Sequence, residues 1–238
     1  NINADCGSTH METLASMTVA GKYDLGIAFD GDADRCLLVD EQGNMIDGDK
    51  VLAVCAAKLR REGKLTNDTV VATVMSNLGL HEFCRNEKLA LLCTAVGDRH
   101  VLEKMLEGDY ALGGEQSGHT IFREYATTGD GQLTALQFLC ALAQSGKKAS
   151  ELVSCCKQYP QELINVTLDE ESGAKERVLS SDALWAAVKE KEAELAGEGR
   201  ILIRASGTEP LIRVMVEAKT DEIAHKTATD LADMVKTL

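Results

Sequence analysis

Three aspartates lie at alternate positions in the segment "FDGDADR", which covers residues 29–35. Carboxylates this close repel one another, so a chain that keeps Asp30, Asp32 and Asp34 together needs a compensating positive charge. A hard divalent cation with oxygen ligands supplies it, and three carboxylates at this spacing can converge on one ion. The alternative is a solvated, aspartate-rich turn, which the apolar flanking residues disfavour. The segment therefore predicts a metal site, with Arg35 beside it to stabilise charge on an anionic ligand.

The same spacing also fits a calcium-binding loop, because Glu41 falls at position 12 when Asp30 is counted as position 1. Two features argue against that loop. Its sixth position needs glycine for a sharp turn and is Arg35 here, and both flanks look like strands instead of helices. A calcium-binding interaction protein is therefore kept only as an alternative hypothesis.

A second polar segment, "GGEQSGH", covers residues 113–119. Glu115, Ser117 and His119 occupy alternate positions, so in an extended segment their side chains would face the same way. A carboxylate, a hydroxyl and an imidazole on one face suit hydrogen bonding to sugar hydroxyls, and His119 could exchange a proton near neutral pH. The alternative is a glycine-rich turn between two strands.

A third segment, "RASGTEPLIR", combines two guanidinium groups, two hydroxyls and a glycine between two predicted strands. This combination is typical of a cradle for a phosphate group, although its position between strands excludes a strand-to-helix P-loop. A plain hairpin is the alternative. The residues concerned are Arg204, Ser206, Gly207, Thr208 and Arg213. A fourth segment, "VGDRHV", places Asp98 and Arg99 at a strand-to-helix turn, either in contact with a ligand or as a cap and a surface charge.

Composition limits the classes of partner. The 238 residues carry a net charge of −13, which argues against general affinity for nucleic acid or membranes because both are anionic. Eight cysteines without a C-x-x-C pair predict reduced, buried thiols in a cytoplasmic protein. No apolar run reaches membrane-spanning length. A hydrophobic content of 45% predicts a packed globular fold.

The elements that must position these loops alternate between strand and helix over the first two thirds of the chain. Short apolar strands are expected at 24–29 and 36–40, around the aspartates. Beyond them the alternation predicts right-handed βαβ units and a mixed, mainly parallel α/β sheet. Asp49 and Asp130 are the expected N-caps of two of the helices.

The order of elements changes after Pro160. Two strands flank the third polar segment, and the helical patterns lie before and after this strand pair. The resulting β-α-β-β-α order predicts a separate small α+β domain at the C-terminal end. Its elements are expected at 162–168, 181–196, 200–205, 211–218 and 221–237.

The metal, sugar and phosphate segments, in this order, resemble those of the α-D-phosphohexomutase superfamily. "TTGDG", "VGDR" and "RASGTEPLIRVMVEA" are similar to the phosphoglucosamine mutase branch of that superfamily. The resemblance covers essentially the whole chain. It implies that residues 1–43 are the end of domain 2 with the metal loop, 44–157 are domain 3, and 160–238 are domain 4. The first domain, which carries a phosphoserine, is expected to be missing from this chain.

The resemblance also implies an activity, an isomerase that interconverts glucosamine 6-phosphate and glucosamine 1-phosphate. The reaction runs through a phosphoserine and a bisphosphate intermediate and serves amino-sugar nucleotide and cell-wall precursor synthesis. One Mg²⁺ would be held by Asp30, Asp32 and Asp34. Arg35 would steady the transferred group, and His119 would be an acid or base.

Substrate contacts follow from the same resemblance. Glu115 and Ser117 would bind sugar hydroxyls, and the third segment would bind the non-reacting phosphate. Without its serine domain the chain is expected to be inactive alone, and a homodimer is a further expectation. The alternatives are a phosphomannomutase or phosphoglucomutase, or a non-catalytic fragment that binds sugar phosphates.

Overall fold

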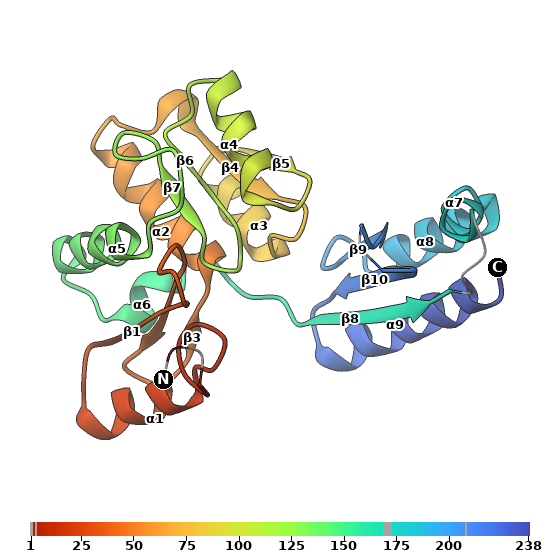
Figure 1. The fold of residues 1–238 in the computed structure, drawn as a ribbon, viewed down its shortest axis with the longest axis horizontal. Coiled ribbons are helices and arrows are strands. Elements are labelled where there is room, and N and C mark those ends of the chain that lie inside the picture. Colours follow the sequence, from red (N-terminus) through yellow and green to blue (C-terminus); the bar gives the residue numbers. More distant parts are fainter. Residues whose placement is uncertain (1, 3, 169–172, 208) are drawn as a thin grey trace. The chain divides into compact units, whose positions relative to one another are not determined.

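The computed structural model describes residues 2, 4–168, 173–207 and 209–238. Contacts between residues divide the chain into two compact units, Asn1–Lys157 and Gln158–Leu238. The ribbon in Figure 1 shows the elements of each unit. Within the described residues, no helix is long and apolar enough to cross a membrane.

A small antiparallel sheet carries the aspartate segment. Its strands lie in the order β1-β2-β3, and α1 packs against β1. The apolar alternation around the aspartates predicts β1 and β2 to within one residue, whereas the two-residue β3 leaves no periodic signal. The elements are α1 (Glu12–Gly21), β1 (Leu25–Phe29), β2 (Cys36–Asp40) and β3 (Met45–Ile46).

A four-stranded sheet with the order β5-β4-β6-β7 forms the centre of the first unit. The middle strand β4 is β-branched at all positions but Ala72 and is buried along its whole length, as expected for a strand covered on both faces. It pairs in parallel with β5 and β6, while β7 adds an antiparallel edge. The predicted mixed α/β class is therefore confirmed. The strands are β4 (Thr69–Thr73), β5 (Ala90–Thr94), β6 (Leu112–Gly114) and β7 (Thr120–Phe122).

Helices cover this sheet, and α2 is the most buried of them because it contacts α3, α5, β3 and β6. Its predicted N-cap was wrong by two residues. Asp47, in an extended conformation, accepts a hydrogen bond from the Lys50 N–H and caps the helix, while Asp49 lies inside the first turn. Asp130 is confirmed as the cap of α5. The helices are α2 (Gly48–Arg61), α3 (Leu78–Asn86), α4 (Asp98–Glu107), α5 (Gly131–Ser145) and α6 (Ala149–Val153), with a short 3₁₀ turn, η1 (Thr66–Asp68).

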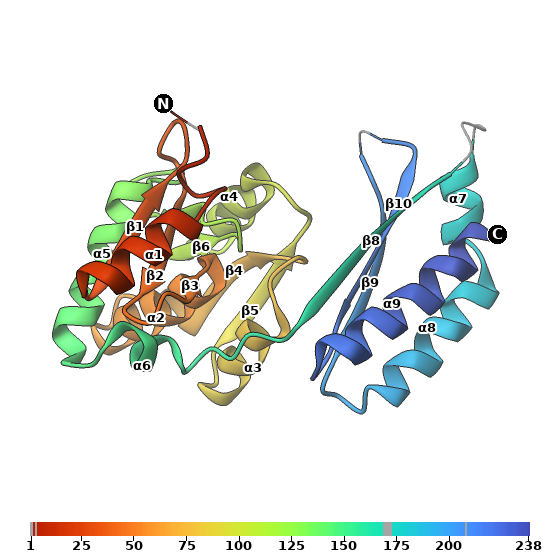
Figure 2. The same cartoon turned by 90° about the horizontal axis from the view of Figure 1, so that it is seen from below.

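The second unit confirms the predicted β-α-β-β-α order. Its three strands form an antiparallel sheet in the order β8-β10-β9, and Figure 2 shows α8 and α9 on one face of it. The short helix α7 was not predicted. The elements are β8 (Gln161–Thr167), α7 (Ala174–Leu179), α8 (Asp182–Glu194), β9 (Arg200–Ala205), β10 (Leu211–Glu217) and α9 (Asp221–Lys236).

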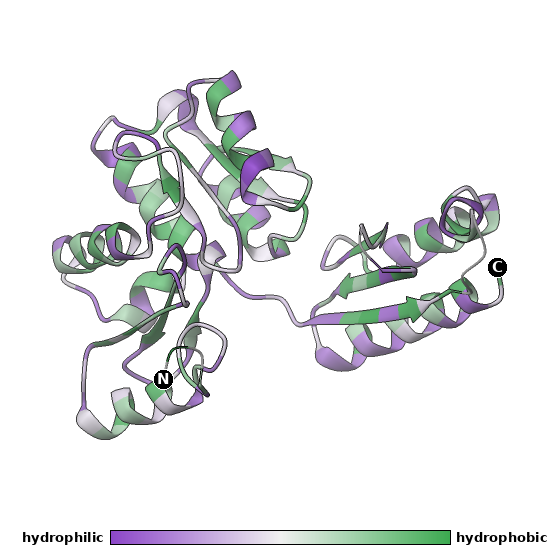
Figure 3. Cartoon of the chain, in the orientation of Figure 1, coloured by the Kyte–Doolittle hydropathy of each residue, from purple (hydrophilic) through white to green (hydrophobic). Residues whose placement is uncertain are grey.

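Each unit has an apolar core of its own. In the first, Leu38 and Ile46 of the small sheet pack in one cluster with Leu52 of α2 and Phe138 of α5. In the second, β10 packs against α9, whose hydrophilic and hydrophobic residues are coloured in Figure 3. The first core contains residues of both sheets of the first unit, so it does not separate residues 1–43 from residues 44–157. The predicted domain boundary between residues 43 and 44 therefore stays a prediction.

The cysteines only partly follow their prediction. All eight are free, and Cys36, Cys55, Cys84 and Cys156 are buried. The expectation of buried thiols was wrong for three others, because their side chains lie on solvent-facing positions of β5, α5 and the end of α6. These are Cys93, Cys140 and Cys155.

Candidate active site

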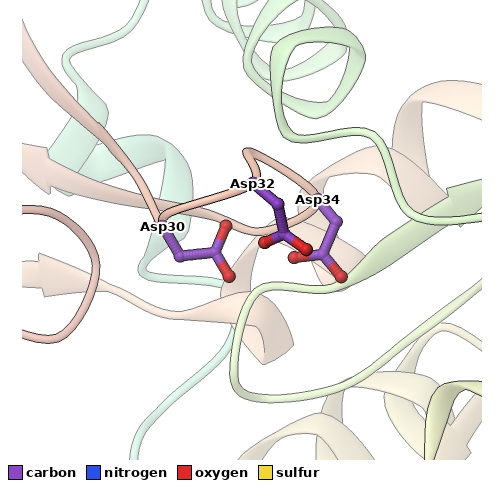
Figure 4. A group of neighbouring side chains, drawn as sticks. All are labelled: Asp30, Asp32 and Asp34. Atoms are coloured by element: carbon purple, nitrogen blue, oxygen red, sulfur yellow. The ribbon is translucent and has the colours of Figure 1, made fainter. Parts of the chain in front are cut away.

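The aspartate segment forms the loop of the β1–β2 hairpin. Ala33 takes a positive φ of 60°, which turns the chain and lets the three carboxylates gather. One carboxylate oxygen from each of Asp30, Asp32 and Asp34 lies within 4.8 Å of the others, and Figure 4 shows the side chains leaving one loop together. The described residues contain no second group of this kind.

Charge in this loop is only partly balanced. The Arg35 N–H donates to Asp30 Oδ1 at 3.1 Å, and Arg35 Nε lies 3.7 Å from Asp30 Oδ2 and 3.9 Å from Asp34 Oδ1. Burial, and then the neighbouring Asp30 carboxyl, raise the pKa of Asp34. One guanidinium against three carboxylates leaves a net negative site. A hard divalent cation with oxygen ligands fits this donor set.

His119 connects the metal loop to the second polar segment. Its ring is 2% exposed, and Nδ1 lies 2.9 Å from Asp34 Oδ2. The Gly129 N–H donates to Nε2 at 3.0 Å, so Nε2 is an acceptor and the ring proton resides on Nδ1, which donates to Asp34. A Cβ on residue 129 would lie 2.5 Å from the ring, so glycine is needed there. Both ring nitrogens of His119 are therefore engaged.

The second polar segment is a tight turn between β6 and β7, and the expectation of an extended segment was wrong. The Glu115 N–H donates to the His119 carbonyl at 2.9 Å, the Gly118 N–H donates to the Glu115 carbonyl at 3.0 Å, and Gly118 has φ 97°. The turn breaks the alternation of side chains. Ser117 Oγ stays within 3.4 Å of Glu115 Oε2, whereas His119 faces the metal loop.

Glu115 also contacts the fourth polar segment. Its Oε1 accepts a hydrogen bond from the Gly97 N–H at 3.0 Å, directly before α4. Gly97, not Asp98, is the N-cap of α4. Asp98 lies in the first turn, where its Oδ1 accepts a hydrogen bond from the Arg99 N–H at 2.8 Å. Arg99 is exposed and pairs with Glu103 at 2.7 Å. The strand-to-helix turn thus supports Glu115 through its backbone.

The start of α2 supports the same turn, which the sequence did not reveal. The Gly48 N–H donates to the Gln116 carbonyl at 2.9 Å, and Gln116 Nε2 donates to Asp47 Oδ2 at 3.3 Å. Burial raises the pKa of Asp47. The available signal in the sequence was the pair Asp47 and Gly48 at the start of a helix. Only the fold shows that these residues contact the turn that contains Gln116.

The phosphate segment is the β9–β10 hairpin loop of the second unit. Arg204 and Arg213 face each other across the two strands, and burial, followed by the charge of Arg213, lowers the pKa of Arg204. Arg213 pairs with Glu209 at 3.2 Å, and its Nε is buried without a hydrogen-bond partner in the described chain. Thr208, the remaining predicted residue, lies outside the described residues.

The structure does not support the calcium-loop alternative, because Glu41, the ligand expected at position 12, has other partners. Glu41 accepts a hydrogen bond from the Ser150 N–H at 3.1 Å, at the start of α6, and a second from the Ser150 hydroxyl. It is not part of the group formed by Asp30, Asp32 and Asp34.

Comparison with known proteins agrees with the fold. The profile described as "Phosphoglucomutase/phosphomannomutase, alpha/beta/alpha domain III" matches residues 47–159, and "Phosphoglucomutase/phosphomannomutase, C-terminal domain" matches residues 163–234. The chain belongs to the phosphoglucomutase/phosphomannomutase family. Within this family, the chain is 51% identical over 236 residues to the phosphoglucosamine mutase of Shouchella clausii, covering 99% of this chain and 52% of the relative.

Two further relatives match over a similar share of this chain and of their own length. The phosphoglucosamine mutase of Acetivibrio thermocellus is also 51% identical, over 99% of this chain and 52% of its own length. The crystal structure of Aspergillus fumigatus N-acetylphosphoglucosamine mutase in complex with GlcNAc-6P and magnesium matches with a TM-score of 0.79 and 25% identity, covering 99% of this chain and 53% of that one. The chain therefore spans about half the length of the relatives it matches.

Proposed function

We propose that this chain is part of a phosphoglucosamine mutase, which interconverts glucosamine 6-phosphate and glucosamine 1-phosphate. The observation that carries the proposal is the contact between Asp34 and His119, because it joins a cation site to the hydroxyl-bearing turn within one unit. Relatives at 51% identity are named for this activity. The relatives are about twice as long, so the activity belongs to a longer protein.

We propose that Asp30, Asp32 and Asp34 hold one Mg²⁺. The fungal relative was crystallised with magnesium and a hexosamine phosphate, and three converging carboxylates suit that ion. Bound there, the ion neutralises charge on a phosphoryl group. Arg35 lies between two of the carboxylates, with a side chain that is 45% exposed. Its guanidinium can therefore turn to a phosphoryl oxygen once the ion compensates the aspartates.

Glu115 and Ser117 bind the sugar in this proposal. Gly97 and Ser117 both donate to the Glu115 carboxylate, which fixes its orientation and leaves acceptor capacity for a hydroxyl or an ammonium group. Arg204, Ser206, Gly207 and Arg213 bind the non-reacting phosphate, together with Thr208. His119 is the proposed acid or base, and its contact with Asp34 also orients that ligand.

A phosphoserine outside these residues would donate its phosphoryl group to a hydroxyl of the sugar phosphate, and the freed serine hydroxyl would then take the other phosphoryl group back from the bisphosphate intermediate. This chain would then bind sugar phosphate without turnover, and the other partners are that serine-bearing domain and a second copy in a homodimer. The chain's own task is positioning and charge neutralisation, which account for most of the catalysis of phosphoryl transfer.

The test compares the chain alone with the chain fused to the N-terminal half of the Shouchella clausii relative. We expect the fusion to convert glucosamine 1-phosphate and the chain alone to be inactive. Glucose 1-phosphate and mannose 1-phosphate should be converted at least about tenfold more slowly, since a polar site discriminates by one or more paired groups. Equal turnover of all three sugars would refute the glucosamine assignment. Turnover by the chain alone would refute the role of the external serine.

A further inference from the structure

Lys175 reaches the phosphate loop from a part of the chain outside the predicted motif. It lies in the first turn of α7, 31 residues before Ser206, and its Nζ donates to the Ser206 carbonyl at 2.8 Å. The lysine is half-buried, and α7 packs against β9. A lysine ammonium has three donors and no acceptor, so this contact uses one donor and leaves two.

Other hydrogen bonds fix the loop around the peptide group that joins Ser206 and Gly207. The Ser206 N–H donates to the Leu211 carbonyl at 2.9 Å, and Ser206 Oγ accepts from the Glu209 N–H at 3.3 Å. Ser206 itself is 4% exposed. Gly207, in contrast, has open space around its Cα, with no atom within 4 Å of the place a Cβ would take. Among the contacts of the described residues, the bond from Lys175 is therefore the one that restrains the peptide between Ser206 and Gly207.

Holding this carbonyl also sets the direction of the next N–H. In a trans peptide the C=O and the following N–H point in opposite directions, so the Gly207 N–H points away from Lys175. Within the described chain, that N–H makes no hydrogen bond. A free backbone N–H with a fixed direction is a donor that an anion can use.

The positively charged side chains around the loop favour the binding of an anion. The Arg204 side chain makes no hydrogen bond or ion pair with the described residues, whereas the Arg213 side chain pairs with Glu209. Lys175 adds a third cation, and among the described residues Glu209 is the carboxylate that forms an ion pair with one of these three. In a chain with a net charge of −13, these three cations come from the β9–β10 hairpin and the first turn of α7.

We infer that Lys175 is a positioning residue of the phosphate site. It holds the Ser206–Gly207 peptide so that the Gly207 N–H donates to a phosphoryl oxygen that Arg204 binds from the side of the strands. The inference rests on the proposed function of this loop. It deepens that function by adding a residue from a different element.

The test is a titration of the whole 238-residue chain with inorganic phosphate, followed by the ¹⁵N and ¹H shifts of the Gly207 amide. Lys175→Met removes the ammonium and keeps most of the stem. We expect it to raise the phosphate Kd about tenfold, which corresponds to the loss of one charge-assisted hydrogen bond, and to reduce the shift of the Gly207 amide. Lys175→Arg should restore both within about twofold, because its guanidinium can also donate to the carbonyl.

Two further variants separate the hydrogen bond from the charge. Lys226→Met is the matched control, since Lys226 is an exposed lysine of α9 in the same unit and its side chain makes no hydrogen bond or ion pair with the described residues. It should change the Kd less than about twofold. Lys175→Gln keeps a donor without charge and should give an intermediate Kd. It also replaces Lys175→Met should that variant fail to fold.

The outcomes distinguish this inference from the proposed function. Equal effects of Lys175→Met and Lys226→Met, with Arg204→Ala still weakening phosphate binding, would overturn the role of Lys175 alone. If the unaltered chain binds no phosphate and Arg204→Ala changes nothing, the phosphate role of the whole loop fails, and the inference fails with it.

Discussion

At the scale of single residues, the site is a set of charged groups whose hydrogen bonds and ion pairs determine how each group is held. Asp34 belongs to the carboxylate group and also accepts a hydrogen bond from His119 Nδ1, so its position depends on two loops. Arg35 lies near two of the carboxylates and is half-exposed. Two predictions concern these residues.

Asp32→Asn should weaken Mn²⁺ binding, with Mn²⁺ used as a spectroscopic substitute for Mg²⁺. Removing one of three carboxylate ligands lowers the negative charge at the ion and should raise the Kd at least about tenfold. Electron paramagnetic resonance of free Mn²⁺ measures this. Asp24→Asn is the control, because Asp24 is an exposed carboxylate outside the group. Equal Kd values in both variants would refute the metal site.

Two substitutions of His119 should have different effects. Asn places its amide donor near the position of Nδ1 and can still donate to Asp34, whereas Gln reaches the position of Nε2, where Gly129 donates. We expect Mn²⁺ binding to be retained better in His119→Asn. Both variants should lose about 1–3 kcal/mol of unfolding free energy, because each leaves one buried polar group unpaired. Mn²⁺ affinity that is equal in both variants would contradict a positioning role.

At the scale of elements, the helix starts support the loops. The first residue of α2 donates to the turn that carries Glu115, the residue before α4 donates to the Glu115 carboxylate, and α6 begins where Glu41 binds. Backbone N–H groups at helix starts lack partners within their own helix, so they are available for such contacts. Two predictions test these contacts.

Gly48→Ala should destabilise the turn between β6 and β7. A Cβ on Gly48 would lie 2.0 Å from the Glu115 carbonyl oxygen, so either the turn or the helix must move. We expect a loss of about 1–3 kcal/mol in unfolding free energy, measured with urea. Arg61→Ala is the control at the exposed end of the same helix and should stay within about 0.5 kcal/mol. An unchanged Gly48→Ala variant would show that this close approach does not exist.

Glu41→Gln should reveal a pH-dependent contribution of the contact with α6. Partial burial acts to raise the pKa of Glu41, but the side-chain and backbone hydrogen bonds from Ser150 outweigh it and lower the pKa below 4.5. A lowered folded-state pKa gives stability above the unfolded-state value, which is lost as pH falls through the folded-state value. The stability difference between the two proteins should therefore shrink from pH 6 to about pH 3. A constant difference in urea unfolding would contradict it.

At the scale of the whole molecule, two separate cores share one chain. The first unit contains all eight cysteines, and the second contains the single tryptophan, Trp185. The indole N–H of Trp185 donates to the Leu179 carbonyl at 2.7 Å, so its fluorescence reports on the packing of α7 and α8. Two probes therefore report on the two units independently.

Urea unfolding followed by these probes should give two transitions. Burial raises the pKa of Cys36 and Cys55 to about 12, so these thiols should react with a maleimide only when the first unit unfolds. Cys93 and Cys140 should react in the native state, whereas burial raises the pKa of the Cys155 thiol and should slow its reaction. We expect midpoints of cysteine labelling and Trp185 fluorescence to differ, since each unit has its own core. Coincident midpoints would indicate one cooperative unit.

The amino-acid sequence by itself determined most of the elements and the residue types of the three polar loops. Apolar periodicity, capping aspartates and β-branched runs are local signals, and they predicted β4, α5 and the β-α-β-β-α order of the second unit. They were silent on β3 and α7, which are too short for a period, and shifted the cap of α2 from Asp47 to Asp49.

Only the tertiary structure decided which loops meet and how their side chains are held. His119 and Asp34 are 85 residues apart, and Gln116 and Asp47 are 69 apart. Such pairings depend on strand order and close backbone approach, which no local pattern contains. The turn at Gly118 also separated Ser117 from His119, although alternation placed them on one face. The sequence specifies the residue types at a site, whereas packing determines which of their atoms are adjacent. The reason is that a hydrogen bond requires its two atoms to be close in space, not in sequence.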